Sequence, residues 1–184
     1  MCKTDMTDQD FVAHSVCDDP NINLLMTNTD YFVSLYETLH RKMPFFGSGI
    51  EESLERIPEE HLHRPVGHRT IAQLLAHMIA WREDLIKRLH ELPREKIEIN
   101  SPEDWPDATG KTKADFLRAF ADTKVELQKG LEKYDVSKMY DLVHPDYDYI
   151  NVNILEGGAQ HDIYHIGQVN MLAAILRELE EAKE

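Results

Sequence analysis

TIAQLLAHMIAWREDLIKRL, residues 70–89, is the stretch of sequence that predicts the fold most clearly. Thr70 and Gln73 fit a capping box, in which a threonine hydroxyl and a side chain three residues later satisfy backbone groups at a helix start. Apolar side chains then recur every three or four residues and share one face: Ile71, Leu74, Met78, Trp81, Leu85 and Leu89. Pro93 follows and cannot continue a helix. The stretch therefore predicts an amphipathic helix that begins after Thr70 and packs one face against a core.

The same apolar periodicity predicts three further long helices, over about residues 28–43, 112–131 and 151–180. A short amphipathic segment with Ile50, Leu54 and Ile57 follows the first. Residues 93–110 contain three prolines and are typical of a long crossover rather than a tight turn. The sequence thus predicts an all-α protein, a four-helix bundle with a long crossover between its second and third long helices.

Charge and composition narrow the classes of partner. The formal net charge is −14 at pH 7, from 34 acidic and 20 basic residues, which argues against nucleic acid and anionic membranes. No apolar run approaches the length of a membrane span. The hydrophobic content of 42% is typical of a globular protein. We therefore expect neither a nucleic-acid partner nor a membrane partner.

The N-terminal segment, residues 1–22, is polar and lacks a helical pattern, so we expect a tail followed by one bundle domain over residues 23–184. The first ten residues, MCKTDMTDQD, have neither the basic region nor the apolar stretch of a secretory signal. Both cysteines, Cys2 and Cys17, fall in this tail, which is a poor place for a disulfide. These features predict a cytoplasmic protein.

Two histidines four residues apart, His161 and His165, lie in the last predicted helix. Residues at this spacing share a helix face, and this face carries leucine and isoleucine on neighbouring turns, so the pair faces the core. Burying two imidazoles is costly unless each finds a partner. A third imidazole, for which His77 is the candidate, would complete a three-histidine metal site with an open position. Gly157 and Gly158, one turn earlier, would leave room for a ligand or a close backbone approach.

Two other interpretations of the histidines stay open on the residues alone. A buried histidine is commonly a polar group of the core, hydrogen-bonded to a carbonyl or a carboxylate. The bundle could also bind a metal or a ligand without catalysing a reaction.

Several residues are candidates for supporting roles. Gln168, one turn after His165, is a candidate to orient a ligand, because a buried amide needs hydrogen bonds. Trp81 fits the core better than a substrate platform. Asp84, two turns after His77, is a candidate general base. His144, in the aromatic-rich stretch before the last helix, could line the mouth of a pocket.

The remaining histidines carry less information. His61, His63 and His68 fall in a short polar connection, and we expect them on the surface. His40 lies at the end of a predicted helix, where an imidazole can interact with the last carbonyls.

The two histidine-bearing stretches together resemble a known family. TIAQLLAHMIAWR, residues 70–82, and HDIYHIGQ, residues 161–168, resemble the DinB-like superfamily of four-helix metalloenzymes, including its YfiT-like members. Residues 54–66, LERIPEEHLHRPV, are similar to the usual lead-in to the second helix of that family. The resemblance covers about residues 28–180. It implies a left-handed bundle with an up-down-down-up helix order, and a divalent zinc or nickel ion bound by His77, His161 and His165.

The resemblance also implies a class of function. Its members include thiol-dependent transferases and hydrolases, and homodimers are frequent among them. For this chain it implies a metal-dependent hydrolase or thiol S-transferase that acts on a small-molecule substrate, with a low-molecular-weight thiol in the second case. The motif does not identify the catalytic residues, the reaction or the metal. The alternative is a non-catalytic bundle that binds a metal or ligand for sensing or sequestration.

Overall fold

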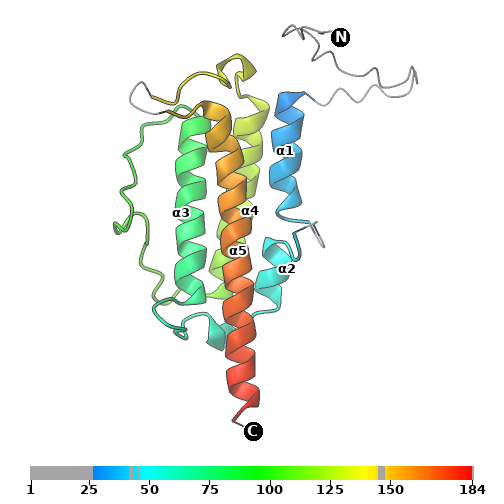
Figure 1. Ribbon diagram of the computed structural model, residues 1–184, viewed down its shortest axis with the longest axis vertical. Helices are drawn as coiled ribbons and strands as arrows, with labels where there is room; N and C mark the ends of the chain where they lie inside the picture. Colours follow the sequence, from blue (N-terminus) through cyan, green and yellow to red (C-terminus); the bar gives the residue numbers. More distant parts are fainter. Residues whose placement is uncertain (1–26, 42–43, 45, 145–147, 184) are drawn as a thin grey trace, which may run out of the picture.

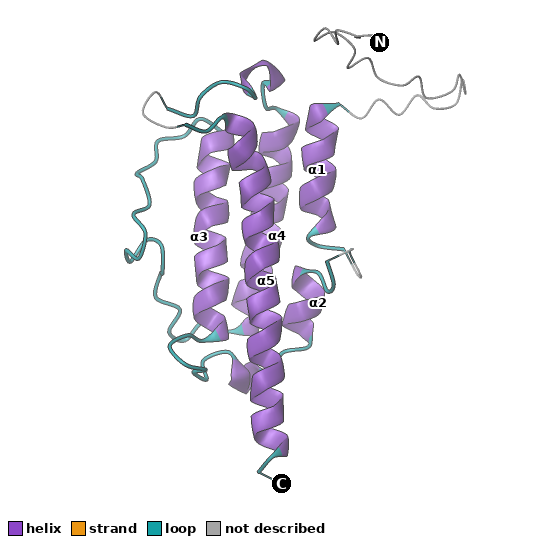
Figure 2. Cartoon of the chain, in the orientation of Figure 1, coloured by secondary structure: helices purple, strands orange, loops and turns teal. Residues whose placement is uncertain are grey.

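The computed structural model describes residues 27–41, 44, 46–144 and 148–183. These residues form helices and no strands, so the predicted all-α class is confirmed (Figure 2). The helices are α1 (Asn28–Thr38), α2 (Ile50–Glu55), α3 (Ile71–Leu89), α4 (Lys113–Glu132) and α5 (Asn151–Glu181), with short 3-10 turns at Glu59–His61 and Val136–Lys138. The tail predicted over residues 1–22, with Cys2 and Cys17, lies outside the described residues. No helix in the described part of the chain is both long enough and apolar enough to cross a membrane.

The four helices α1, α3, α4 and α5 lie side by side around one core (Figure 1). α3 contacts both α4 and α5, and α1 contacts the same two helices from the other side. In Figure 1, α3 and α4 both run upward, whereas α1 and α5 run downward. The connection between α3 and α4 therefore returns along the outside of the bundle, as a crossover over residues 93–110 requires.

Local capping explains where the helices begin. The Thr70 hydroxyl accepts a hydrogen bond from the Gln73 N–H at 3.1 Å, and the Gln73 side chain accepts one from the Thr70 N–H at 3.0 Å. Thr112 and Asp115 form the same reciprocal pair at the start of α4. The predicted starts at Thr70 and Thr112 are therefore confirmed. Such a box satisfies two backbone donors that the first helical turn leaves free.

α1 ends at Thr38, so the predicted extension to Met43 was wrong. The Leu39 carbonyl accepts a hydrogen bond from the Ile50 N–H at 2.8 Å, which draws the chain into α2. Gly49 makes this turn possible, because a Cβ at that position would clash with the carbonyl oxygens of Leu39 and Arg41.

His61 is buried, with 0% of its surface exposed, so the predicted surface position was wrong. Its Nε2 lies 2.8 Å from Oε2 of Glu180, and the Arg64 guanidinium donates to the other oxygen of the same carboxylate at 2.7 Å. Glu180 belongs to the end of α5 that extends beyond the other helices in Figure 1. The extended helix covers a connection that looks solvent-exposed from its polar sequence, whereas His63 and His68 are exposed as predicted.

Candidate metal centre

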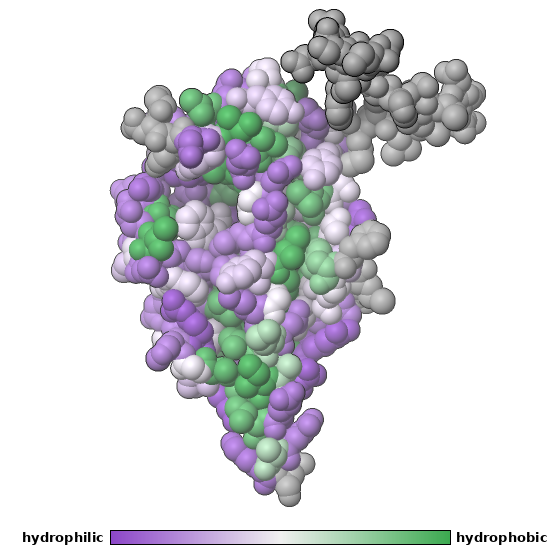
Figure 3. Space-filling model, in the orientation of Figure 1, coloured by the Kyte–Doolittle hydropathy of each residue, from purple (hydrophilic) through white to green (hydrophobic). Residues whose placement is uncertain are grey.

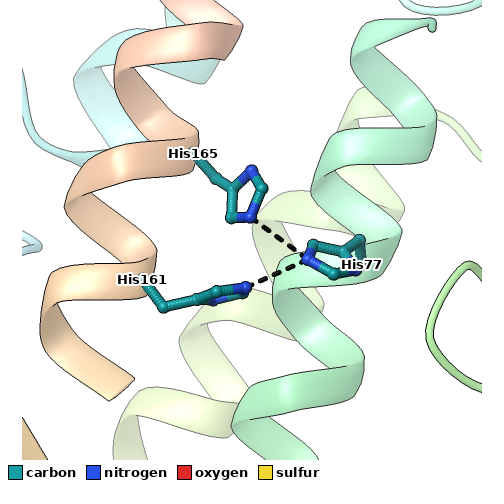
Figure 4. A group of neighbouring side chains, drawn as sticks. All are labelled: His77, His161 and His165. Atoms are coloured by element: carbon teal, nitrogen blue, oxygen red, sulfur yellow. Dashed lines mark hydrogen bonds between the residues drawn. The ribbon is translucent and has the colours of Figure 1, made fainter. Parts of the chain in front are cut away.

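Three imidazoles from two helices meet inside the bundle (Figure 4). His77 comes from α3, and His161 and His165 come from consecutive turns of α5. Nε2 of His77 lies 3.0 Å from Nε2 of His161 and 3.1 Å from Nε2 of His165. The three candidate ligand atoms lie within 4.8 Å of one another. The structure thus brings together the three histidines that the sequence singles out.

Hydrogen bonds on the far side of two rings fix which nitrogen carries the proton. Nδ1 of His77 lies 2.7 Å from the Asp104 main-chain carbonyl, and Nδ1 of His165 lies 2.7 Å from the Gln168 side-chain oxygen. Both oxygens are acceptors, so both Nδ1 atoms donate. In the neutral rings, Nε2 of His77 and Nε2 of His165 therefore carry lone pairs that face each other.

Protonation of His161 or His165 is disfavoured, so it does not readily remove the repulsion between the facing lone pairs. Burial, followed by the neighbouring His165 and His77 rings, lowers the pKa of His161 to about 3. Burial also lowers the pKa of His165, although its hydrogen bond to Gln168 acts in the opposite direction. His161 and His165 are therefore held toward their uncharged forms. The outer hydrogen bonds leave the Nε2 lone pairs of His77 and His165 facing the centre of the cluster.

The donor set fits a divalent metal. Zinc binds imidazole nitrogen at about 2.0–2.1 Å, which places two ligands of a tetrahedral ion about 3.3 Å apart. The observed separations of 3.0 and 3.1 Å are close to that value. The outer hydrogen bonds are also of the kind that orients metal-binding histidines. His77, His161 and His165 are the residues that would hold the ion.

Asp104 is a buried residue that the sequence reasoning missed, and it is 4% exposed. Its carbonyl accepts from His77, while its carboxylate accepts from the Trp81 indole N–H at 2.8 Å and from the Asn100 N–H at 2.8 Å. The crossover is thereby fixed against α3. The segment EDWPD around Asp104 has no helical period, so only its acidic and aromatic content could have drawn attention to it.

The next residue, Trp105, covers one face of His77. The two rings stack at 4.1 Å between centroids with an interplanar angle of 12°. The Arg69 guanidinium carbon lies 3.6 Å from the centroid of the Trp105 ring, on which it forms a cation–π contact. The His77 ring is thus held both by its hydrogen bond and by a stacked layer.

A cavity of about 510 Å³ opens beside the three histidines. All three rings line it, together with both tryptophans of the protein, Trp81 and Trp105. Its size falls in the range of about 300–1,000 Å³ that is usual for small-molecule sites. The histidine cluster therefore has an open side that a small molecule could reach.

A buried polar network supports the cluster from the side of α1 and α4. Arg82 donates to Asp162 through Nε at 2.8 Å and to Thr123 through Nη1 at 3.2 Å. Its Nη2 donates to Nε2 of His40 at 3.1 Å, and His40 Nδ1 in turn donates to Glu51 at 2.6 Å. Asp162 lies between the two α5 histidines in sequence, so this ion pair fixes the rotation of α5 against α3. His40 is therefore part of a network and not a partner of helix-end carbonyls.

The other predicted candidates have different surroundings. Trp81 lines the cavity and donates to Asp104. Asp84 also lines the cavity, and its carboxylate accepts from Arg88 at 2.8 Å and from Arg94 at 3.2 Å. His144 is exposed and lies outside the described lining of this cavity.

Comparison with known proteins agrees with the family that the motifs suggest. Neither a search of curated proteins nor a search of solved structures returns a match. The model of the DinB superfamily matches residues 48–169, which include all three histidines of the cluster. The match spans more than half of the chain, and the chain therefore belongs to the DinB superfamily.

Proposed function

We propose that the protein is a metal-dependent enzyme, a hydrolase or a thiol S-transferase, that acts on a small molecule at the histidine cluster. One observation carries the proposal: the lone pairs of His77 and His165 converge at 3.1 Å because Asp104 and Gln168 hold the protons on the opposite nitrogens. A divalent cation, zinc or nickel, is the partner that satisfies all three rings at once.

The chain's own residues would prepare the site for such chemistry. A bound divalent ion lowers the pKa of a coordinated water or binds a thiolate, and thereby supplies a nucleophile. Asp104 and Gln168 hold two rings in the required tautomer. The cavity beside the cluster would hold the substrate next to this nucleophile. Hydrolysis and thiol transfer differ in the nucleophile and make the same use of these residues.

Metal analysis of the protein purified without a histidine tag tests the site. We expect about one zinc or nickel ion per chain, measured by inductively coupled plasma mass spectrometry. The His165→Ala variant should lose the metal, because two imidazoles make a weak site. The His68→Ala variant removes an exposed histidine and should retain it. Full occupancy in the His165→Ala protein would contradict the assignment.

The cobalt-substituted protein separates an enzyme from a non-catalytic binder. An open position predicts that azide or a small thiol changes the visible spectrum of the cobalt ion, because it enters the first coordination sphere. A spectrum that neither reagent changes would favour a sensing or sequestering protein. A substrate screen with and without thiols would then distinguish hydrolysis from thiol transfer.

We also propose that the protein is a cytoplasmic homodimer. Apolar residues are exposed along α5, with Tyr164 at 62%, Met171 at 66% and Leu179 at 47%, and Figure 3 shows apolar surface along the lower part of this helix. Such a patch favours association with another protein surface. Light scattering should give twice the mass of one chain, and Met171→Glu should reduce it to that of a monomer. A monomeric parent protein would reject the dimer.

A further inference from the structure

We propose that the cavity binds an elongated small molecule with a carboxylate at the end remote from the histidines, and that Arg88 binds this carboxylate. The inference deepens the proposed function, because it assigns the substrate class of the same site. It depends on that function only for the position of the reacting group, which would lie at the histidine cluster.

One face of α3 runs the length of the cavity. His77, Trp81, Asp84 and Arg88 all line it. At about 100° per residue these four lie within roughly 40° of His77 around the helix axis. Arg88 comes three turns after His77, which at about 1.5 Å per residue separates their Cα atoms by roughly 16 Å along the axis. The cavity therefore has a histidine end and a guanidinium end.

The facing side of α5 has a matching order. Asn153, Gly157, His161 and His165 line the cavity at four-residue spacing. α5 runs antiparallel to α3 in Figure 1, so its histidines face His77 and its earlier turns face the Arg88 end. Gly157 has no side chain, and a Cβ built there would meet no atom within 4 Å. The space between the two ends is therefore open along α5.

The Arg88 end of the cavity carries a net positive charge that could bind an anion. Arg88 Nε and Arg94 Nη1 both donate to the Asp84 carboxylate, at 2.8 and 3.2 Å. Two guanidinium groups and one carboxylate leave one formal positive charge. Within the described residues the two Nη groups of Arg88 have no protein acceptor, and its side chain is 22% exposed. A planar guanidinium with free Nη groups matches the geometry of a carboxylate.

Most of the exposed lining of the cavity is apolar. Leu85, Ile99 and Ile154 are among its lining residues. A ligand that reaches from the histidines to Arg88 would therefore pack an apolar body against this lining. A positively charged end is unexpected in a protein of net charge −14, which as a whole repels anions, so the local positive charge would select the ligand.

Octanoate and 1-octanol, added to the metal-free protein, test the inference without reference to catalysis. The two probes share chain length and differ in the charge of the end group. The two tryptophans of the protein both line the cavity, so intrinsic fluorescence reports on its occupancy directly. We expect octanoate to bind about tenfold more tightly than 1-octanol, as is reasonable for a charged hydrogen bond at a partly exposed site.

Substitutions locate the charge. Arg88→Gln should abolish the preference for octanoate and leave the affinity for 1-octanol within twofold. Lys87→Gln removes the same charge from the exposed neighbouring position and should leave the preference intact. Arg88→Lys keeps the charge and should retain part of the preference, which guards against misfolding of the neutral variant. Equal binding of both probes to the parent protein, or an unchanged preference in Arg88→Gln, would overturn the inference.

A second pair of probes separates this inference from the proposed function. In the cobalt-loaded protein, 8-mercaptooctanoate should bind more tightly than 1-octanethiol, with the thiolate observed in the visible spectrum. Cobalt binding without any effect of Arg88→Gln would reject the carboxylate site and keep the metal site. An Arg88-dependent preference for octanoate in a protein that takes up no metal would reject the metal site and keep the carboxylate site.

Discussion

Gln168 shows how one side chain controls the chemistry of another. Its oxygen accepts the Nδ1 proton of His165 at 2.7 Å, which directs the Nε2 lone pair of that ring toward His77. In the structure Gln168 contacts His165 and thereby orients a candidate metal ligand. Its orientation of a bound small molecule remains a prediction. A hydrogen bond of this kind holds the ring in one orientation and raises its basicity.

Gln168→Leu should therefore weaken zinc binding about 10–100-fold, the usual effect of losing such a partner. Gln168→Glu keeps an acceptor oxygen and should retain most of the affinity. Competition with a chelating dye measures both constants. Gln160→Leu makes the same change at an exposed position of α5 and serves as the control. Parent-like affinity in Gln168→Leu would show that the ring is held by packing alone.

Among the elements, α5 carries two adjacent glycines with opposite surroundings. A Cβ at Gly157 would meet nothing within 4 Å, whereas a Cβ at Gly158 would clash with the Tyr36 hydroxyl and lie 2.9 Å from Leu85 Cδ2. Tyr36 cannot easily move, because its hydroxyl donates to the Leu155 carbonyl at 2.8 Å. One glycine thus leaves open space and the other permits close packing.

The two alanine substitutions should accordingly change stability in opposite directions. Gly157→Ala should stabilise the protein by roughly 0.5–1 kcal/mol, because alanine is the better helix former. Gly158→Ala should destabilise it by about 1–3 kcal/mol, because a methyl group is forced into a packed site. Urea denaturation of both variants measures the free energies of unfolding. Equal signs would show that the space at Gly157 is not open in solution.

The junction of α1, α2, α3 and α4 contains a histidine that should respond to pH. The His40 side chain is 2% exposed, and burial lowers its pKa, with Glu51 opposing this shift through a hydrogen bond and Arg82 and Lys124 adding to it by their charge. His40 Nε2 accepts from Arg82, so protonation would remove that hydrogen bond. The unfolded chain binds a proton here at a higher pH than the folded protein does.

The free energy of unfolding should therefore stay level above about pH 7 and fall as the pH drops below about 6.5, the pKa of an unperturbed histidine. The fall ends once the pH passes below the lowered pKa of His40 in the folded protein. In His40→Gln this dependence should be shallower by the contribution of one group, whereas His68→Gln should keep the parent slope. Urea titrations at several pH values measure the free energy of unfolding. The same pH dependence in His40→Gln and the parent protein would reject the assignment of this effect to His40.

For the molecule as a whole, much of the fold could be predicted from local patterns. Thr70 and Thr112 mark the starts of α3 and α4, because capping depends on residues three positions apart. The end of α1 at Thr38 could not be predicted, because it depends on a backbone contact between Leu39 and Ile50. The burial of His61 depends on Glu180 from the far end of the chain. The left-handed arrangement of the helices remains a prediction from the resemblance.

The residues of the candidate site likewise divide into those that the sequence could predict and those that it could not. His161 and His165 could be paired by spacing, and His77 was joined to them through the two motifs together. Asp104 and Trp105 could not be found, because an irregular crossover carries no periodic signal and its contact with His77 runs partly through a main-chain carbonyl. Metal binding by the three histidines remains a prediction.

Binding of a metal between α3 and α5 should stabilise the whole molecule, because the ion binds the folded protein and the unfolded chain lacks the site. With free zinc at 100 times Kd, the gain is about 2.7 kcal/mol. Calorimetry should show a lower Tm after chelation and recovery after zinc is added back. His77→Ala, which breaks the link between the two helices, should show no such recovery. If added zinc does not change the Tm of the parent protein, the result would contradict a metal site.

The position of the three histidines along the chain would also limit when a metal site can form. His77 precedes His161 by 84 residues, and two of the three rings belong to α5, the last helix that the ribosome makes among those described. Over the 84 residues from His77 to His161, a growing chain therefore offers only one imidazole of the cluster. Ions captured at that stage would be held weakly and exchanged. A site that needs all three rings would therefore be complete only after α5 is made.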